Sequence, residues 1–123
     1  MAKIVVIDDE PIIRETVSEM LKKAGHEVES AEDGDAGLSL CRDLDADLVI
    51  TDIIMPEKEG IETIRDLVRD HPTIKIIAIS GGGRIDNTDL LRIARHFGAH
   101  HILEKPFSRK DLLEAVDKLL GEI

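Results

Sequence analysis

Five short strand-like segments, most of them apolar, alternate along this chain with segments whose apolar residues recur at helical spacing. The first of them, Ile4 to Ile7, is an unbroken β-branched run that stops at Asp8, which is the pattern of a strand buried on both faces. Strands of that kind belong to parallel sheets. We expect strands at residues 4–7, 26–30, 47–51, 74–79 and 100–103, and helices at residues 11–24, 33–43, 60–70, 86–97 and 108–120.

The ends of the predicted helices carry suitable residues. Pro11 fits the first turn of its helix, and Gly25 fits the position just after its end. Ser108 with Asp111 resembles a capping box in which Asp replaces Glu. Cys41, beside Leu40 and Leu44, is expected on the inner side of a helix in a reducing compartment.

The alternation predicts one α/β domain over residues 1–123, without a linker or repeat. Five βα units imply right-handed crossovers and a doubly wound, five-stranded parallel sheet with helices on both faces. Because binding sites in open parallel sheets form at the carboxyl ends of the strands, the residues that follow the strands should carry the function.

Charge and hydropathy exclude several classes of protein. The formal net charge is −10, so most of the surface would repel a phosphate backbone, and direct nucleic-acid binding is not expected. The apolar stretch near the N-terminus is too short for a signal peptide or a membrane span, so we expect a cytoplasmic protein without membrane insertion.

The residues that follow the predicted strands form one constellation. Asp8-Asp9 follows the first strand, Asp52 the third, Ser80 the fourth, and Lys105 comes just after the fifth. Three carboxylates at one sheet edge would repel one another unless a cation joined them, and a hard ion such as Mg²⁺ suits such oxygen ligands.

Asp52 is the candidate nucleophile for a phosphoryl group, which it would hold as an aspartyl phosphate. Lys105 and Ser80 would neutralise and orient the phosphoryl oxygens. Gly81 leaves space beside Ser80, and a cis peptide before Pro106 would aim the lysine inward. Each motif alone has a plainer explanation as a helix cap or a turn, so the order and spacing of the whole set carry the prediction.

Together the motifs resemble a response-regulator receiver domain over essentially the whole chain. They are Asp8-Asp9, Asp52 followed by Met55-Pro56 and Gly60, Ser80-Gly81, and Lys105-Pro106-Phe107. The resemblance implies strand order 2-1-3-4-5, with Asp52 as the phosphoacceptor. It also implies that Mg²⁺ is held by Asp8, Asp9, Asp52 and the backbone carbonyl of Ile54. Ser80 would be the switch hydroxyl and Lys105 the contact to the phosphoryl group.

The same resemblance implies partners. The phosphoryl group would come from a sensor histidine kinase, a phosphotransfer protein or a small acyl phosphate. Phosphorylation would alter binding of a downstream protein partner through the face of the fourth helix, fifth strand and fifth helix, where Arg92, Arg95, Ile102 and Lys110 are candidate contacts. The family is not usually counted among enzymes.

Two departures from the family pattern concern the coupling of the switch and the lifetime of the phosphorylated state. Ile102 stands where many receivers have Tyr or Phe, so coupling from Ser80 to the partner face lacks its usual aromatic ring. Ile54 and Gly82, two residues beyond Asp52 and Ser80, offer no side chain that could orient an attacking water. We therefore predict slow loss of the phosphoryl group, with Ile54 also shielding it from solvent.

Two other functions fit parts of the pattern. A Mg²⁺-dependent phosphohydrolase would also form an aspartyl phosphate, but such phosphatases usually place a second acid two residues after the nucleophile, where this chain has Ile54. A constitutive receiver-like scaffold that is never phosphorylated would keep the fold without using the site, and the missing aromatic is the feature in its favour.

Overall fold

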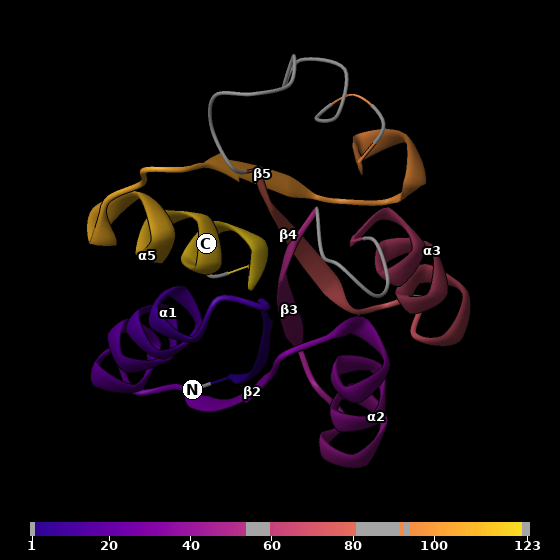
Figure 1. Cartoon of the computed structure of the whole chain (residues 1–123), viewed down its shortest axis with the longest axis horizontal. Helices are drawn as coiled ribbons and strands as arrows, with labels where there is room; N and C mark the ends of the chain where they lie inside the picture. Colours follow the sequence, from indigo (N-terminus) through magenta and orange to yellow (C-terminus); the bar gives the residue numbers. More distant parts are fainter. Residues whose placement is uncertain (1, 54–59, 81–91, 93, 122–123) are drawn as a thin grey trace.

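The computed structural model describes residues 2–53, 60–80, 92 and 94–121. Five strands among these residues form one parallel sheet. The strands are β1 (Lys3–Ile7), β2 (Glu27–Ala31), β3 (Leu48–Asp52), β4 (Lys75–Ser80) and β5 (His101–Glu104). Their order is β2-β1-β3-β4-β5, with every neighbouring pair parallel (Figure 1). The predicted doubly wound sheet and its strand order are confirmed.

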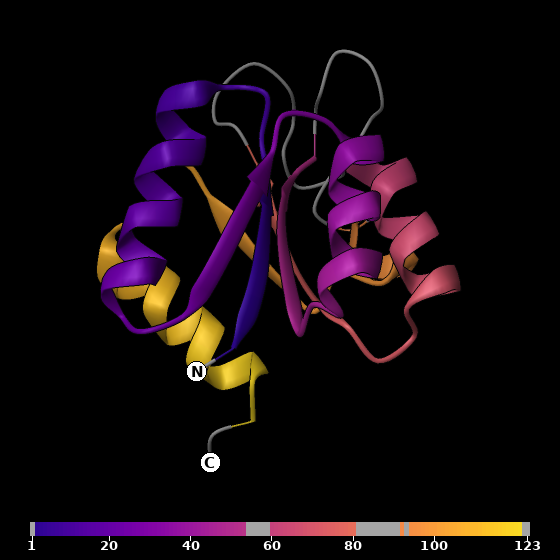
Figure 2. The ribbon, with the colours of Figure 1, turned by 90° about the horizontal axis from the view of Figure 1, so that it is seen from below.

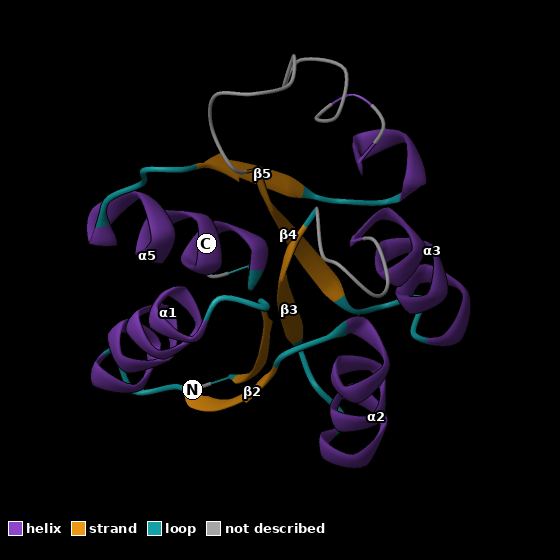
Figure 3. Cartoon of the chain, in the orientation of Figure 1, coloured by secondary structure: helices purple, strands orange, loops and turns teal. Residues whose placement is uncertain are grey.

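Helices cover both faces of the sheet. They are α1 (Pro11–Lys23), α2 (Gly34–Leu44), α3 (Gly60–Asp70) and α5 (Arg109–Leu119). Figure 2 shows α1 and α5 on one side of the sheet and α2 and α3 on the other. The helix predicted for residues 86–97 lies mostly outside the described residues, but residues 94–97 are helical. Figure 3 shows the resulting three layers of helix, strand and helix.

Local capping explains where several helices begin and end. Pro11 occupies the first turn of α1, and Gly25, just beyond the end of that helix, has a φ of +97°, which favours glycine. The Asp33 side chain accepts a hydrogen bond from Ala36 N at the start of α2. Ser108 does the same for Asp111 N, at 3.0 Å, at the start of α5. This bond confirms the Ser108 half of the predicted capping box.

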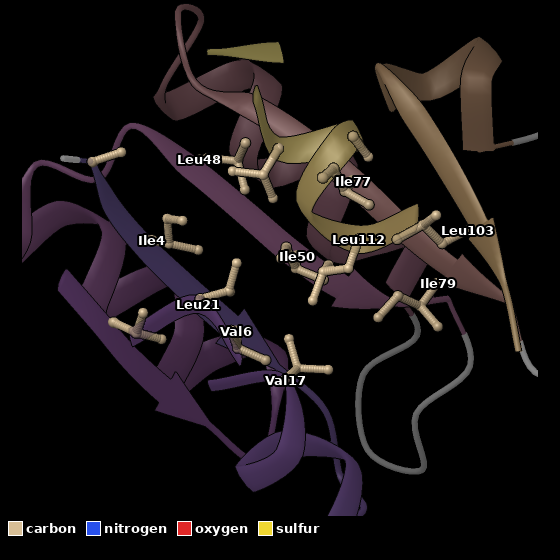
Figure 4. Packing of buried hydrophobic residues seen from close by; sticks show 14 residues of the cluster. Ile4, Val6, Val17, Leu21, Leu48, Ile50, Ile77, Ile79, Leu103 and Leu112 are labelled. Carbon is tan, nitrogen blue, oxygen red and sulfur yellow. The ribbon is translucent and has the colours of Figure 1, made fainter. Parts of the chain in front are cut away.

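The sheet has a hydrophobic core on each face because alternate residues of its central strands point in opposite directions. On one face, strand residues pack against Val17, Leu21 and Leu112 of α1 and α5. Figure 4 shows this cluster, with Ile4 and Val6 of β1 among its members. The residues packed on the other face include Val5, Ile7, Val49, Ile76, Ile64, Leu67 and Cys41. Burial on both faces explains the unbroken apolar runs in the sequence.

Cys41 belongs to the second core. Its side chain is buried on α2, as predicted, and burial raises the pKa of its thiol to about 12. A thiol in this state packs as a small apolar group, because the reactive thiolate is not formed near neutral pH.

Gly37 lets α2 lie directly against β1. A Cβ atom at this position would overlap with the buried Ile7 side chain, so an added methyl group has no space. We expect Gly37→Ala to lower the free energy of unfolding by about 1–2 kcal/mol, because the cost of overpacking exceeds the stability gained from the better helix propensity of alanine. Urea denaturation should show this loss. Ser39→Ala on the same half-buried helix is the control, and an equally stable Gly37→Ala variant would contradict the packing argument.

Candidate phosphoacceptor site

The strand register brings the predicted site residues to one edge of the sheet. Asp52, the last residue of β3, pairs with Ile79 of β4, and Ser80, the last residue of β4, pairs with Glu104 of β5. Lys105 follows directly, and its backbone N–H donates to the Ser80 carbonyl at 2.9 Å. Asp8 follows β1, whose Ile7 pairs with Thr51 of β3. The predicted convergence of these strand ends is therefore observed.

Asp8 is a fully buried carboxylate. Its Oδ1 accepts a hydrogen bond from Glu10 N at 2.9 Å. Its Oδ2 is buried and has no hydrogen-bond partner among the described residues, and it lies 3.7 Å from Lys105 Nζ. Arg14 supports the backbone here, since its Nη1 donates to the Asp8 carbonyl at 2.8 Å. A buried carboxylate oxygen without a donor is costly unless a cation binds it.

Asp52 is also buried, with 5% of its surface exposed. Its Oδ2 lies 3.2 Å from Lys105 Nζ, which is a charge-assisted hydrogen bond. The backbone around it is held on both sides: Thr51 Oγ1 donates to the Asp52 carbonyl, and Ile53 N donates to the Ile79 carbonyl. The Asp52 carboxylate is thus fixed at the end of a rigid central strand.

Lys105 connects three carboxylates. Its Nζ is 3.1 Å from Glu10 Oε1, 3.2 Å from Asp52 Oδ2 and 3.7 Å from Asp8 Oδ2. The Lys105–Pro106 peptide bond is cis, as predicted. Burial lowers the pKa of Lys105, but the charges of Asp52 and Asp8 and the hydrogen bonds to Glu10 and Asp52 outweigh it, so the pKa is raised overall. The side chain therefore carries a positive charge into the site.

Burial and the charges of the site also act on Asp8. Burial raises the pKa of Asp8 to about 6, and the negative charges of Asp52 and Asp9 add to the rise. The Glu10 N–H bond and the charge of Lys105 oppose it without cancelling it. The single positive charge of Lys105 thus does not compensate the negative charge of the carboxylates at this site. A further cation would bind here favourably.

The carboxylates fit a hard divalent cation. Asp8, Glu10 and Asp52 each offer an oxygen, and these oxygens lie within 4.8 Å of one another. Mg²⁺ prefers oxygen ligands of this kind, and Asp8 Oδ2 has no hydrogen-bond partner within the described part of the chain. Asp9 is half-buried and is not in this group, while Ile54 lies outside the described residues. Both stay predictions as metal ligands.

Glu10 is the site residue that the sequence analysis missed. It follows the Asp8-Asp9 pair directly, and its position beside predicted metal ligands is the signal that could have found it. Ser80, by contrast, is where it was predicted, buried at the end of β4 with 1% of its surface exposed. Gly81 and Gly82 lie outside the described residues.

The predicted partner face is partly described. Arg92, Arg95 and Lys110 are exposed. Ile102, in the place of the usual aromatic, is half-buried on β5 and packs against the core cluster on the α2 and α3 side. Within the described part of the chain, no helix is long and apolar enough to cross a membrane.

Comparisons with known proteins agree with this geometry. Residues 4–117 match the family model of the response regulator receiver domain. The chain is 35% identical to Protein PilH of Pseudomonas aeruginosa, over 98% of this chain and 99% of PilH. It is 32% identical to the transcriptional regulatory protein CpxR of Klebsiella pneumoniae, of which it spans 50%.

A solved structure is also similar. The crystal structure of a response regulator receiver domain protein from Clostridium thermocellum superimposes with a TM-score of 0.90 at 31% identity, covering 99% of this chain and 96% of that one. A parallel sheet in the order β2-β1-β3-β4-β5, a buried strand-end aspartate held by a lysine, and a family match over nearly the whole chain agree with one another. The chain belongs to the response regulator receiver domain family.

Proposed function

We propose that this receiver domain accepts a phosphoryl group on Asp52 and uses it to switch the binding of a partner protein. One observation carries the proposal: the buried Asp52 carboxylate lies 3.2 Å from Lys105 Nζ, beside an Asp8 oxygen that has no hydrogen-bond partner among the described residues. A nucleophile, a cation for the phosphoryl oxygens and carboxylate oxygens for a metal ion thus lie together at one edge of the sheet.

In the transfer step, a carboxylate oxygen of Asp52 attacks the phosphorus of the donor. With an acyl phosphate, the bond between phosphorus and the acyl oxygen breaks, and the donor leaves as a carboxylate. With a phosphohistidine of a sensor histidine kinase or a phosphotransfer protein, the P–N bond breaks and the leaving imidazole nitrogen takes a proton. Lys105 neutralises charge on the phosphoryl oxygens, and Ser80 supplies a hydroxyl at the same strand edge.

Mg²⁺ is the proposed cofactor, and when bound it would neutralise negative charge on the carboxylates and on the incoming phosphoryl oxygens. Asp8, Asp9 and Asp52 would hold it together with the backbone carbonyl of Ile54, as the family resemblance implies. Two features of Asp8 support a cation here: its Oδ2 accepts no hydrogen bond from the described residues, and its pKa is raised by burial and by neighbouring negative charges.

The output of the switch is proposed to be protein binding rather than turnover. The face formed by the fourth helix, β5 and α5 offers the exposed cations Arg92, Arg95 and Lys110, which suit an acidic partner surface. Ile102 on this face would respond to Ser80 by a change of packing, since it has no ring to rotate. We propose that the domain works in the cytoplasm, where phosphoryl donors and protein targets are present.

The proposal is tested by incubating the protein with acetyl phosphate, with Mg²⁺ or with a chelator, and following the intact mass. We expect a gain of one phosphoryl group with Mg²⁺ and little gain with the chelator. Measuring the affinity of the domain for a partner protein before and after phosphorylation would then test the switch. No gain under conditions in which a control receiver domain reacts would instead favour a constitutive scaffold.

Ile54 is expected to prolong the phosphorylated state. Asparagine at this position would offer an amide that orients a water toward the phosphorus, so Ile54→Asn should speed the loss of the phosphoryl group roughly tenfold. The decay of the phosphorylated mass after removal of the donor measures this rate. Ile12→Asn, at an exposed position on α1, is the control, and equal lifetimes in Ile54→Asn and wild type would argue against the shielding role.

A further inference from the structure

Glu10 occupies the N-cap position of α1 but does not cap the helix. N-cap side chains usually accept a hydrogen bond from the first turn, and the Glu10 side chain makes none. Its Oε1 instead lies 3.1 Å from Lys105 Nζ, a residue 95 positions away in the sequence. Its backbone N–H also donates to Asp8 Oδ1. Glu10 is therefore joined to the site by its main chain and by its side chain.

The contact between Glu10 and Lys105 lies on the solvent-exposed side of the site. The Glu10 side chain is 61% exposed, whereas the Lys105 side chain is 18% exposed and that of Asp52 7%. An ammonium group has three protons to donate, and here it faces Glu10 and Asp52 at hydrogen-bond distance, with Asp8 slightly further away. Glu10 thus holds the lysine from the solvent side, where a phosphoryl donor must enter.

We propose that Glu10 is a positioning residue that restrains Lys105 in the unphosphorylated protein and slows phosphoryl uptake. The inference rests on the proposed function of Asp52 and adds a residue to it. For Lys105 to bind the oxygens of an incoming phosphoryl group, its ammonium group must exchange the Glu10 carboxylate for those oxygens. The restraint is modest because the pair is partly exposed and screened by solvent.

Removing the charge of Glu10 while keeping its shape tests the inference. We expect Glu10→Gln to take up the phosphoryl group from acetyl phosphate about two- to fivefold faster than wild type, in line with the strength of an exposed ion pair. Glu19→Gln, roughly 13 Å further along α1, removes the same charge from an exposed position and should leave the rate unchanged. Rates are compared where they no longer depend on the Mg²⁺ concentration.

A second pair of variants separates restraint of Lys105 from simple repulsion of an anionic donor. In a Lys105→Ala background, the Glu10→Gln change should no longer alter the slower residual rate, because the group through which Glu10 acts is gone. The side-chain ¹⁵N signal of Lys105 should also shift in Glu10→Gln and not in Glu19→Gln. Equal acceleration with and without Lys105 would overturn the inference in favour of donor repulsion.

The remaining outcomes distinguish a failure of this inference from a failure of the proposed function. If wild type accepts the phosphoryl group and Glu10→Gln does so at the same rate, the role of Glu10 is overturned while that of Asp52 stands. If wild type accepts no phosphoryl group from any donor, both proposals are overturned. An unchanged Lys105 ¹⁵N signal in Glu10→Gln would show that the two side chains do not form the contact in solution, which also overturns the restraint.

Discussion

Asp52→Asn is expected to abolish phosphoryl uptake. The substitution keeps the size of the side chain but replaces the nucleophilic carboxylate with an amide, which is a far weaker nucleophile and cannot form an acyl phosphate under these conditions. Asp52 is buried beside Lys105 at the end of a central strand, whereas Glu10, the other described carboxylate within hydrogen-bond distance of the lysine, is largely exposed. We expect the initial rate to fall to below roughly one hundredth of that of wild type.

The measurement is the intact mass after incubation with acetyl phosphate and Mg²⁺. Asp117→Asn, which neutralises an exposed aspartate on α5, should react like wild type. Peptide mapping of the phosphorylated wild-type protein should place the group between residues 48 and 53. A full phosphoryl gain in Asp52→Asn would show that another side chain is the acceptor and would remove the assignment.

Asp8→Asn is expected to stabilise the protein in the absence of Mg²⁺. The Asp8 carboxylate is buried, and one of its oxygens has no hydrogen-bond partner among the described residues, so the folded state bears a charge that it does not fully compensate. The rise of its pKa to about 6 reflects the same penalty. Asparagine removes the charge and keeps an oxygen for Glu10 N. We expect the free energy of unfolding at pH 7.5 to increase by on the order of 2 kcal/mol.

The same charge gives a pH dependence with a definite sign. The pKa of Asp8 is about 6 in the folded state and near 3.8 in the unfolded state, so between these values the folded state binds more protons. Without Mg²⁺, the contribution of Asp8 to stability should therefore improve as the pH falls from 7 to 5. Asp8→Asn should lack this contribution, so its stability relative to wild type should decrease over that range. Urea titrations at the two pH values measure the difference.

Mg²⁺ should reduce or reverse the difference in the free energy of unfolding between Asp8→Asn and wild type. Binding to the folded state stabilises wild type by mass action, whereas Asp8→Asn has lost a charged ligand and should gain much less. Asp117→Asn should respond to Mg²⁺ as wild type does. Equal stabilisation of wild type and Asp8→Asn by Mg²⁺ would argue against Asp8 as a ligand, while leaving the effect of the buried charge on the apo protein intact.

The predicted bounds of helices and strands agree closely with the structure, because the sequence patterns that set them are local. α3 has the predicted bounds, Gly60–Asp70, and the strands differ from the predictions by about one residue at their ends. Periodicity and capping act over a few residues, so composition within a short window determines them. The unbroken apolar run of β1 also predicted a strand covered on both faces, and its residues enter both core clusters.

The sequence by itself therefore determined the order of the elements, the parallel sheet and the set of residues that follow the strands. The tertiary structure decided which side chains meet there. The parallel sheet brings the strand ends together whatever the conformation of the loops. The direction of a side chain beyond a strand, however, depends on the backbone of its loop and on the groups that the side chain contacts. This is why Glu10 reaches Lys105 across 95 positions. It is also why the buried oxygen without a hydrogen-bond partner among the described residues belongs to Asp8 rather than to its half-buried neighbour Asp9.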